Sequence, residues 1–458
     1  MSNKYPLIAA AVAAAVTSGY AFAAAPSIST AAGATNTLVM AGSSAAAPAV
    51  ASFIENTLCG GTANTLLVTS AAPSGGTGSK NFLAYSCNTA VQIVDPNGGP
   101  TINSGSLVTI YYRTEGGSVV GALPIAANHT VLRLNLANSS CSGAGLTATC
   151  TVSGLTATSG TQDSWTGAVT PDFVQLGVTD VEPAQLTGKD YPTSYSVSAF
   201  GTATTAQMQT LSQSAVPLFQ QVFGLVVNTS GQSFSSVNLT KEAAANILLG
   251  KYTNWNKVPN ATTGAPISSS SSAITHVDRE PGSGTRTSTN IFFLGYQCGT
   301  QNFINSPTSE TLNFSTGDEL TLANNTAGSI AYASIDNILN PHSNTFPNLV
   351  LAQIDGVTPS TINAATGAYG YWFEATLVPS TTVSTSSPAF SLSDFLQANL
   401  PDLSSVPALP DINVIPFATG NDTPTVPLTS NGQTGTLAVY VNPFTRGGNS
   451  CSVPVENN

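Results

Sequence analysis

The sequence contains very little charge. Of its 458 residues only 7% are charged, whereas an average globular protein has about 25%. Lys and Arg together number 11 and Asp and Glu 22, so the net charge is -11. This deficit of cations argues against a polyanion such as nucleic acid, or an acidic membrane surface, as partner. A small anion held in a local pocket is still compatible with the composition.

Common signatures of catalysis and metal binding are also missing. No two cysteines have CxxC spacing, and the only histidines, His129, His276 and His342, are scattered along the chain. Neither a Gly-x-Ser-x-Gly elbow nor an HExxH motif occurs. A secreted phosphatase is therefore disfavoured, and His276 is interpreted as a strand residue rather than a base. We expect a protein without enzymatic activity, cofactor or metal.

Long apolar runs are confined to the N-terminus. Residues 7–16 are apolar and are followed by the small-residue pattern Ala21-Phe22-Ala23. This pattern predicts a signal peptide over residues 1–23, and the run is too short to span a membrane. No cysteine follows the cleavage region, so we expect no lipid anchor and a periplasmic or secreted protein.

The six cysteines suit an oxidising compartment. Six cysteines allow 15 pairings, and buried free thiols are the alternative. The simplest scheme is Cys141 with Cys150 across a hairpin, Cys59 with Cys87, and Cys298 with Cys451.

Strand-like and helix-like segments alternate along much of the chain. Residues 37–59 are typical of a strand, a Ser-rich turn and a helix, and residues 65–87 are interpreted as a second such unit. Residues 88–172 have alternating patches that favour antiparallel strands and look like an insertion. The alternation returns after Pro171 and implies an α/β sheet, in which ligands bind beyond the carboxyl ends of strands. The fold of the tail is not predicted.

Two Ser/Thr/Gly turns lie at such strand ends. The turn "AGSSAAAP" places Ser43 and Ser44 before a helix, and "SGGTGSK" offers Thr77 and Ser79. Their hydroxyl and amide groups can donate to an anion. They can equally serve as ordinary helix caps.

The segment "DREPGSGTR" combines a cation with a helix start. If Ser283 or Thr285 caps the following helix, its free amides and dipole favour negative charge, and Arg279 can contact an oxyanion through two N–H groups. Gly284 lets the backbone approach the ligand. The alternative is a capped helix beside a surface arginine.

In "LGVTDVEP", Asp180 would repel an anion unless the ligand donates a proton to it. Phosphate near neutral pH keeps a proton and sulfate does not, so Asp180 would discriminate between them. Otherwise Asp180 is a turn or N-cap residue.

The ordered motifs "AGSSAAAP", "GGTGSK", "LGVTD", "ILLGKYTNW" and "REPGSGTRTSTNIFF" resemble the periplasmic phosphate-binding proteins of phosphate ABC transporters. The resemblance covers about residues 37–87 and 172–375. It implies an α/β fold of two lobes, the type II periplasmic-binding-protein fold, with phosphate between the lobes and transporter permease subunits as partners.

Position by position, the resemblance implies a set of phosphate contacts. The first lobe would supply Ser44, the Ala45 amide and Thr77, although the second turn could be shifted to Ser74 or Ser79. Asp180 would accept the ligand proton. The other lobe would supply Arg279, Ser283, Gly284 and Thr285. Two departures are Ala45, where a bulkier residue is common, and Pro281, where some members have an acid.

The expected organisation follows from this assignment. Lobe I would comprise residues 24–215 with an insertion at about 88–172, lobe II residues 216–325, a return to lobe I residues 326–375, and a C-terminal extension residues 376–458. Strand crossovers near 205–216 and 326–334 would form the hinge. The low charge, insertion and tail also fit a surface-associated protein with a structural or adhesive role and a vestigial site.

Overall fold

The fold is described from a computed structural model of the chain. It describes residues 24–73, 81–154, 165–191, 200–234, 236–296, 298, 310–339, 346–400, 414–415 and 444–456. The expected signal peptide, residues 1–23, lies outside the described residues.

The described residues form a mixed α/β fold with the following elements. The α-helices are α1 (Ile28–Ala32), α2 (Ala47–Phe53), α3 (Ser118–Ala127), α5 (Thr205–Ser214), α6 (Lys241–Leu248), α7 (Gly284–Leu294), α8 (Thr316–Asn325), α9 (Ile335–Leu339), α10 (Thr361–Ala365) and α11 (Pro388–Asn399). The first strands are β1 (Asn36–Gly42), β2 (Leu66–Ala71), β3 (Phe82–Asn88), β4 (Leu107–Arg113), β5 (Thr130–Leu134), β6 (Cys141–Ala144), β7 (Thr147–Ser153), β8 (Thr166–Gly167), β9 (Val169–Phe173) and β10 (Leu176–Thr179). The later strands are β11 (Val216–Asn228), β12 (Asn238–Leu239), β13 (Thr275–Arg279), β14 (Glu310–Asn313), β15 (Ser329–Ser334), β16 (Leu349–Leu351), β17 (Gln353–Ile354), β18 (Trp372–Pro379), β19 (Val414–Ile415), β20 (Phe444–Thr445) and β21 (Val455–Glu456).

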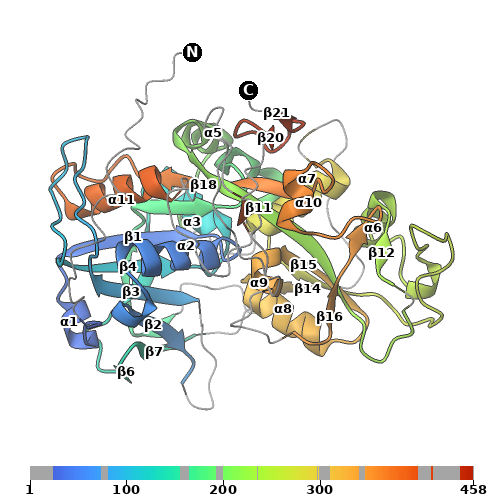
Figure 1. Cartoon of the computed structure of the whole chain (residues 1–458), viewed down its shortest axis with the longest axis horizontal. Coiled ribbons are helices and arrows are strands. Elements are labelled where there is room, and N and C mark those ends of the chain that lie inside the picture. Colours follow the sequence, from blue (N-terminus) through green and yellow to red (C-terminus); the bar gives the residue numbers. More distant parts are fainter. Residues whose placement is uncertain are drawn as a thin grey trace.

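One sheet runs through the whole described molecule. Its strand order is β14-β13-β15-β11-β18-β10-β1-β4-β3-β2-β7-β6. We call strands β14, β13 and β15, together with helices α6, α7, α8 and α9, the β13 half. We call strands β10, β1, β4, β3, β2 and β7, together with helices α2, α3, α5 and α11, the β1 half. Figure 1 shows α2 and β1 on one side of the molecule and α6, α8 and β15 on the other, with β11 and β18 between them.

Strands β11 and β18 connect the two halves. The first part of β11, Val216–Val222, pairs with β18, and its second part, Phe223–Val227, pairs with β15. Almost every residue of β11 is buried, which is typical of a strand covered on both faces. The segment 326–334, expected as the second crossover, instead contains β15, which pairs with β13 and β11. The strand that pairs with both β11 and β10 is β18.

The sequence of helix α6 carries strong signals at both of its ends. Helix α6 begins after Thr240, whose hydroxyl accepts from the Ala243 amide, and its buried residues recur on one face. Gly250 follows its end with φ of +66°, as expected for a C-terminal stop. The cap, the apolar face and the glycine therefore specify both ends of this helix from its own residues.

Two interpretations of the first half of the chain are corrected. Residues 82–88 form strand β3, antiparallel to β2, and not the helix of a second strand-turn-helix unit. The region 88–172 is rich in strands, but β4 pairs parallel to β1 and leads into helix α3. This β4-α3 unit, placed with the antiparallel insertion from the sequence, therefore lies near the centre of the sheet.

The apolar core consists of several clusters, one of which contains residues of both halves, such as Ala122 and Trp255, and three disulfides cross-link the chain. Large buried side chains include Phe53 and Leu392 in the β1 half, and Trp255 and Ile247 in the β13 half. The disulfides are Cys59–Cys87, Cys141–Cys150 and Cys298–Cys451, the three pairs suggested by the sequence. Among the described residues, no helix has the length and apolarity to cross a membrane.

Candidate functional site

The candidate site begins with the turn after β1. Gly42 has φ of +131°, and a Cβ there would lie 2.0 Å from the carbonyl oxygen of Val178, so only glycine fits the turn. The Ser43 amide then donates to the same Val178 oxygen at 2.8 Å. The Ser43 hydroxyl donates to Asp180 and accepts from the Ala46 amide. Ser43 therefore both stabilises the turn before α2 and binds Asp180.

Asp180 lies two residues beyond the end of the parallel pair β1 and β10, and it is 2% exposed. Its backbone amide donates to the Ser118 hydroxyl at 3.0 Å, and its second carboxylate oxygen accepts from the Thr285 hydroxyl at 3.2 Å. Burial raises the pKa of Asp180, while the hydrogen bond from Ser43 and the charge of Arg279 act in the opposite direction. The carboxylate thus joins the two halves through Thr285.

Arg279 ends β13 and is 1% exposed. One terminal guanidinium nitrogen, Nη1, donates to the Thr316 hydroxyl at 2.8 Å. The other, Nη2, donates to the Phe314 carbonyl at 3.0 Å and lies 3.5 Å from the Ser44 hydroxyl. The Nε–H group donates to the Asn313 carbonyl at 3.2 Å. These contacts aim the cation across the boundary toward the first turn.

A buried carboxyl group lies behind this cation. Glu319 of α8 is fully buried, and its Oε2 lies 4.0 Å from the Nε of Arg279. Its other oxygen accepts from the Tyr332 amide at 3.0 Å. Burial raises the pKa of Glu319 well above its usual range, and Arg279 opposes that effect. Pro281 occupies the position two after Arg279, where some members of the resembled family have an acid. In this chain the carboxyl group beside Arg279 is that of Glu319 in α8.

The turn before α7 brings its backbone against Asp180. The Ser283 hydroxyl accepts from the Arg286 amide and caps α7, as one of the two sequence hypotheses predicts. At Gly284 a Cβ would lie 2.2 Å from the Ser118 hydroxyl and 2.8 Å from the Cβ of Asp180. The close approach of α7 to the β1 half therefore requires glycine at this position.

Ser44 and Ala45 contact the β13 half directly. The Ser44 hydroxyl accepts from the Thr316 amide and lies 3.1 Å from the Thr316 hydroxyl. The Ala45 carbonyl accepts from the Ser334 hydroxyl and from the Asn337 side-chain amide. The structure thus gathers eight of the expected site residues around one boundary: Ser43, Ser44, Ala45, Asp180, Arg279, Ser283, Gly284 and Thr285.

Thr77 and Ser79, like Ser74, lie outside the described residues. A further described turn, Gly116-Gly117-Ser118 between β4 and α3, also contacts Asp180. A Cβ at Gly117 would lie 3.1 Å from the Cα of Ser283 and 3.4 Å from Nη2 of Arg279. The sequence signal was present, since a glycine pair and a serine precede the apolar run of α3, but the turn was assigned to an insertion.

Thr316 is the other residue that sequence reasoning missed. It begins α8, whose cap Ser315 accepts from the Asp318 amide at 3.1 Å. The pattern Ser-Thr-Gly-Asp-Glu is a readable helix start. Helices α3, α7 and α8 thus all begin beside Asp180 and Arg279, at Ser118, Gly284 and Thr316. The positive ends of three helix dipoles meet at one buried place.

Arg286, the second arginine of the motif, faces away from this place. Its Nη1 donates to the Arg279 carbonyl at 2.6 Å and lies 3.6 Å from Asp278 and 4.0 Å from Glu310. Burial and the charge of Asp278 raise the pKa of Glu310 to about 7. In the parallel register Glu310 stands beside His276, whose pKa burial lowers to about 4. Arg286 and its acidic neighbours Asp278 and Glu310 therefore hold the backbone of Arg279 on the side away from Asp180.

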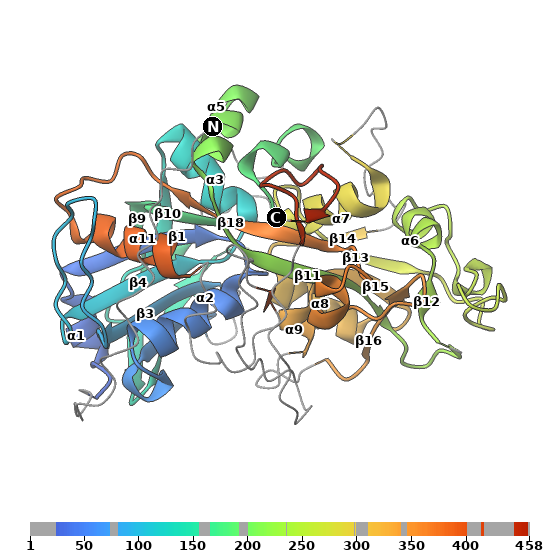
Figure 2. The same ribbon diagram turned by 45° about the horizontal axis from the view of Figure 1, so that its top comes forward.

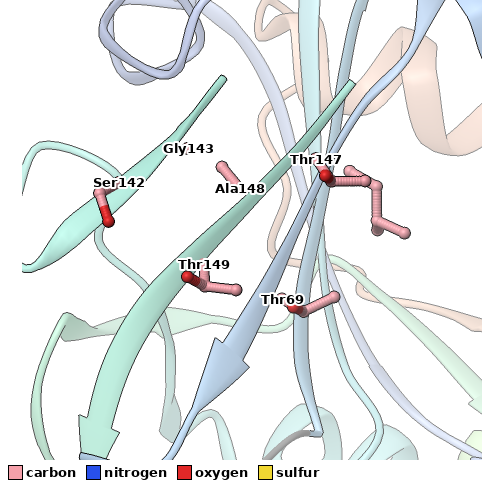
Figure 3. Close-up of a pocket in the computed structure, with 7 residues that line it drawn as sticks. Thr69, Ser142, Gly143, Thr147, Ala148 and Thr149 are labelled. Carbon is pink, nitrogen blue, oxygen red and sulfur yellow. The ribbon is translucent and has the colours of Figure 1, made fainter. Parts of the chain in front are cut away.

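Two other hollows of the described residues have no lysine or arginine in their lining. A hollow of about 300 Å³ lies over β2, β6 and β7, lined by residues such as Thr69, Ser142 and Thr149 (Figure 3). Its lining carries no charged group. The described residues contain no cluster of three or more His, Cys, Asp or Glu side chains able to hold a metal. The boundary around Asp180 and Arg279 is therefore the candidate site.

Comparison with known proteins gives only distant similarities. No family model matches the chain, and no curated protein matches it significantly. Among solved structures, a Clostridium perfringens protein assigned as a phosphate ABC transporter substrate-binding protein, with bound phosphate, is 13% identical with a TM-score of 0.42; the match covers 79% of this chain and 93% of that chain. A phosphate-binding protein from Stenotrophomonas maltophilia is 12% identical with a TM-score of 0.38, covering 75% and 78%. An ABC-type phosphate transport receptor from Vibrio cholerae is 18% identical with a TM-score of 0.32, covering 51% and 75%.

Proposed function

We propose that the chain is an extracytoplasmic solute-binding protein that holds one phosphate ion, or a similar oxyanion, between its β1 and β13 halves. The observation that carries this proposal is the meeting of Arg279, Asp180 and three helix starts in one buried place between the halves. A buried cation and three positive helix ends favour an anion. A carboxylate in the same place favours an anion that brings its own proton.

Each group would have a definite task. The guanidinium of Arg279 would contact two ligand oxygens, exchanging its contacts with Thr316 and Ser44 for the anion. The Gly284 and Thr285 amides at the start of α7, and Ser44 with the Ala45 amide in the first turn, would donate further hydrogen bonds. Asp180 would accept the proton of a partly protonated phosphate.

This arrangement would discriminate against sulfate. A sulfate ion carries no proton near neutral pH, so it would place an oxygen lone pair against the Asp180 carboxylate. The buried carboxylate would then lack a donor and repel the ligand, and such a mismatch typically costs about 1–3 kcal/mol or more for charged groups. Selectivity would come from this unfavourable contact as well as from attraction to phosphate.

Ligand entry requires the halves to separate, because Asp180 and Arg279 are almost completely buried. Strands β11 and β18, which connect the halves, are the place where such a hinge motion would occur. Delivery of the bound ion to the permease subunits of an ABC transporter would be the physiological role. A location outside the cytoplasm agrees with the three disulfides.

One observation favours a second candidate function. The polar groups of the site also satisfy one another: Ser43 donates to Asp180, Ser44 contacts Thr316, and Arg279 donates to three protein oxygens. Such mutual contacts would hold the halves together in a surface-associated protein with a structural or adhesive role and a vestigial ligand site.

Equilibrium dialysis of the full chain against labelled phosphate separates the two candidates. A solute-binding protein takes up one phosphate per chain, and arsenate, which has the same shape and protonation, competes for it. A structural protein takes up none at millimolar phosphate. Arg133→Ala is a matched control, since Arg133 pairs with Asp172 away from the site and its loss should leave uptake unchanged.

A further inference from the structure

The C-terminal segment 444–456 lies over the centre of the molecule. Figures 1 and 2 both show it between α5, on the β1 half, and α7, on the β13 half. Its two ends pair antiparallel as β20 and β21, so the segment forms a closed loop. The proposed function makes no use of this loop.

The loop is covalently attached to the β13 half. Cys451 forms a disulfide with Cys298, which is four residues beyond the end of α7. Helix α7 in turn packs against α6, β13 and β15. A movement of the β13 half therefore carries Cys451 with it.

The residue before Cys451 is attached to the β1 half. The amide and the hydroxyl of Ser450 donate to the carboxylate of Glu182, with amide distances of 3.0 and 3.1 Å to its two oxygens. Glu182 and Ser450 are 6% and 5% exposed, so water competes little for these bonds. Glu182 lies only two residues beyond Asp180 of the candidate site.

The first part of the loop, residues 445–448, is bound to the connecting strand β18. Glu374 accepts from the Thr445 hydroxyl and the Arg446 amide, both at 2.6 Å, and from the Gly448 amide at 2.8 Å. The Arg446 guanidinium stacks at 4.9 Å from the ring centre of Trp372 and 4.7 Å from that of Phe373. The loop is thus a built part of the structure at the point where the halves join.

We propose that residues 444–456 form a strap that ties the two halves together and restrains their separation. Ser450 and Cys451 are adjacent in the chain and are bound to opposite halves. The connection from Glu182 to Cys298 therefore contains no spare residues that could extend when the halves separate. When the halves move apart, the disulfide holds and the hydrogen bonds to Glu182 must break or β18 must bend. Reduction of Cys298–Cys451 would release the strap and favour the open form.

The test measures the separation of the halves in the full chain without phosphate. Spin labels are placed on Val94→Cys in the β1 half and Lys257→Cys in the β13 half, both exposed positions, and their distance distribution is recorded by pulsed electron resonance. The test variant combines Cys298→Ser with Cys451→Ser. The matched control removes a local disulfide, Cys141–Cys150, which lies within the hairpin of β6 and β7 and does not connect the halves.

We expect the strap variant to shift the label distances toward longer values by several ångströms and to broaden them, and the hairpin control to match the wild type. A second variant, Glu182→Ala, keeps all the disulfides and should give the same shift, so the test holds even if the double variant fails to fold. Coincident distributions for the wild type and the strap variants would overturn the proposal. Because no ligand is added, this outcome is independent of whether the chain binds phosphate.

Discussion

The hydroxyl of Ser43 donates a hydrogen bond to the carboxylate of Asp180, although 137 residues separate them in the sequence. The parallel pairing of β1 and β10 brings their carboxyl ends side by side and creates this contact. The other carboxylate oxygen of Asp180 accepts from Thr285 of α7. Asp180 is therefore the point where the β1 half and the β13 half share hydrogen bonds.

Replacing Arg279 with Ala should weaken phosphate binding at least tenfold. Hydrogen bonds to a charged group contribute about 1.5–3 kcal/mol, and the site has no second cation among the described residues that contact Asp180 or Ser44. Calorimetric titration with phosphate measures the effect. Because Glu319 would be left buried without its cation, the thermal unfolding of the variant should be recorded as well.

Arg279→Lys gives a sharper version of this test. It keeps the charge beside Glu319 but removes the planar pair of donors, so stability should be largely retained while affinity still falls. Unchanged phosphate affinity in both variants would show that the anion binds elsewhere.

Replacing Gly284 with Ala should also weaken phosphate binding at least tenfold. The added Cβ would meet the Ser118 hydroxyl at 2.2 Å and Asp180 at 2.8 Å, so α7 cannot approach the β1 half as closely. Overpacking of this kind costs about 1–3 kcal/mol. Gly33→Ala is the control, because its φ is -91° and its nearest atom is at 3.5 Å. Equal affinity in Gly284→Ala and the wild type would contradict the close approach.

His276 should make the fold sensitive to acid. Burial lowers the pKa of His276 from 6.5 to about 4 in the folded chain, so the unfolded chain binds more protons between these values. The contribution of His276 to the free energy of unfolding should therefore fall as pH drops from 6.5 to 4, by up to about 3 kcal/mol, whereas the raised pKa of Glu310 beside it contributes in the opposite direction. Urea unfolding across this range should show a smaller fall for His276→Gln than for the wild type. Parallel curves for the two chains would refute this prediction.

The parts of the fold that sequence predicted well have strong local signals. The caps Thr240 and Ser283, and the glycine after α6, announce their helices within a few residues. Strand β3 was mistaken for part of a helix because its short apolar run has no period that separates strand from helix. Its true state depends on pairing with β2 and β4, which the local sequence does not encode.

The candidate site was predictable where a motif carries unusual residues. Arg279 is conspicuous in a chain with few cations, and Asp180 is conspicuous beside an anion motif. Ser118 and Thr316 are common residues in common helix starts, and only the three-dimensional arrangement brings them to Asp180 and Arg279. Likewise, the contact of Glu182 with Ser450 joins segments 268 residues apart and leaves no local trace in the sequence.

The most direct test of the central claim is calorimetric titration of the wild type and Asp180→Asn with phosphate and with sulfate at pH 7. If Asp180 accepts the ligand proton, the wild type binds phosphate at least about a hundredfold more tightly than sulfate, and Asp180→Asn loses most of that difference because an amide can donate to sulfate. Equal affinities of the wild type for the two ions, or binding of neither, would contradict the account.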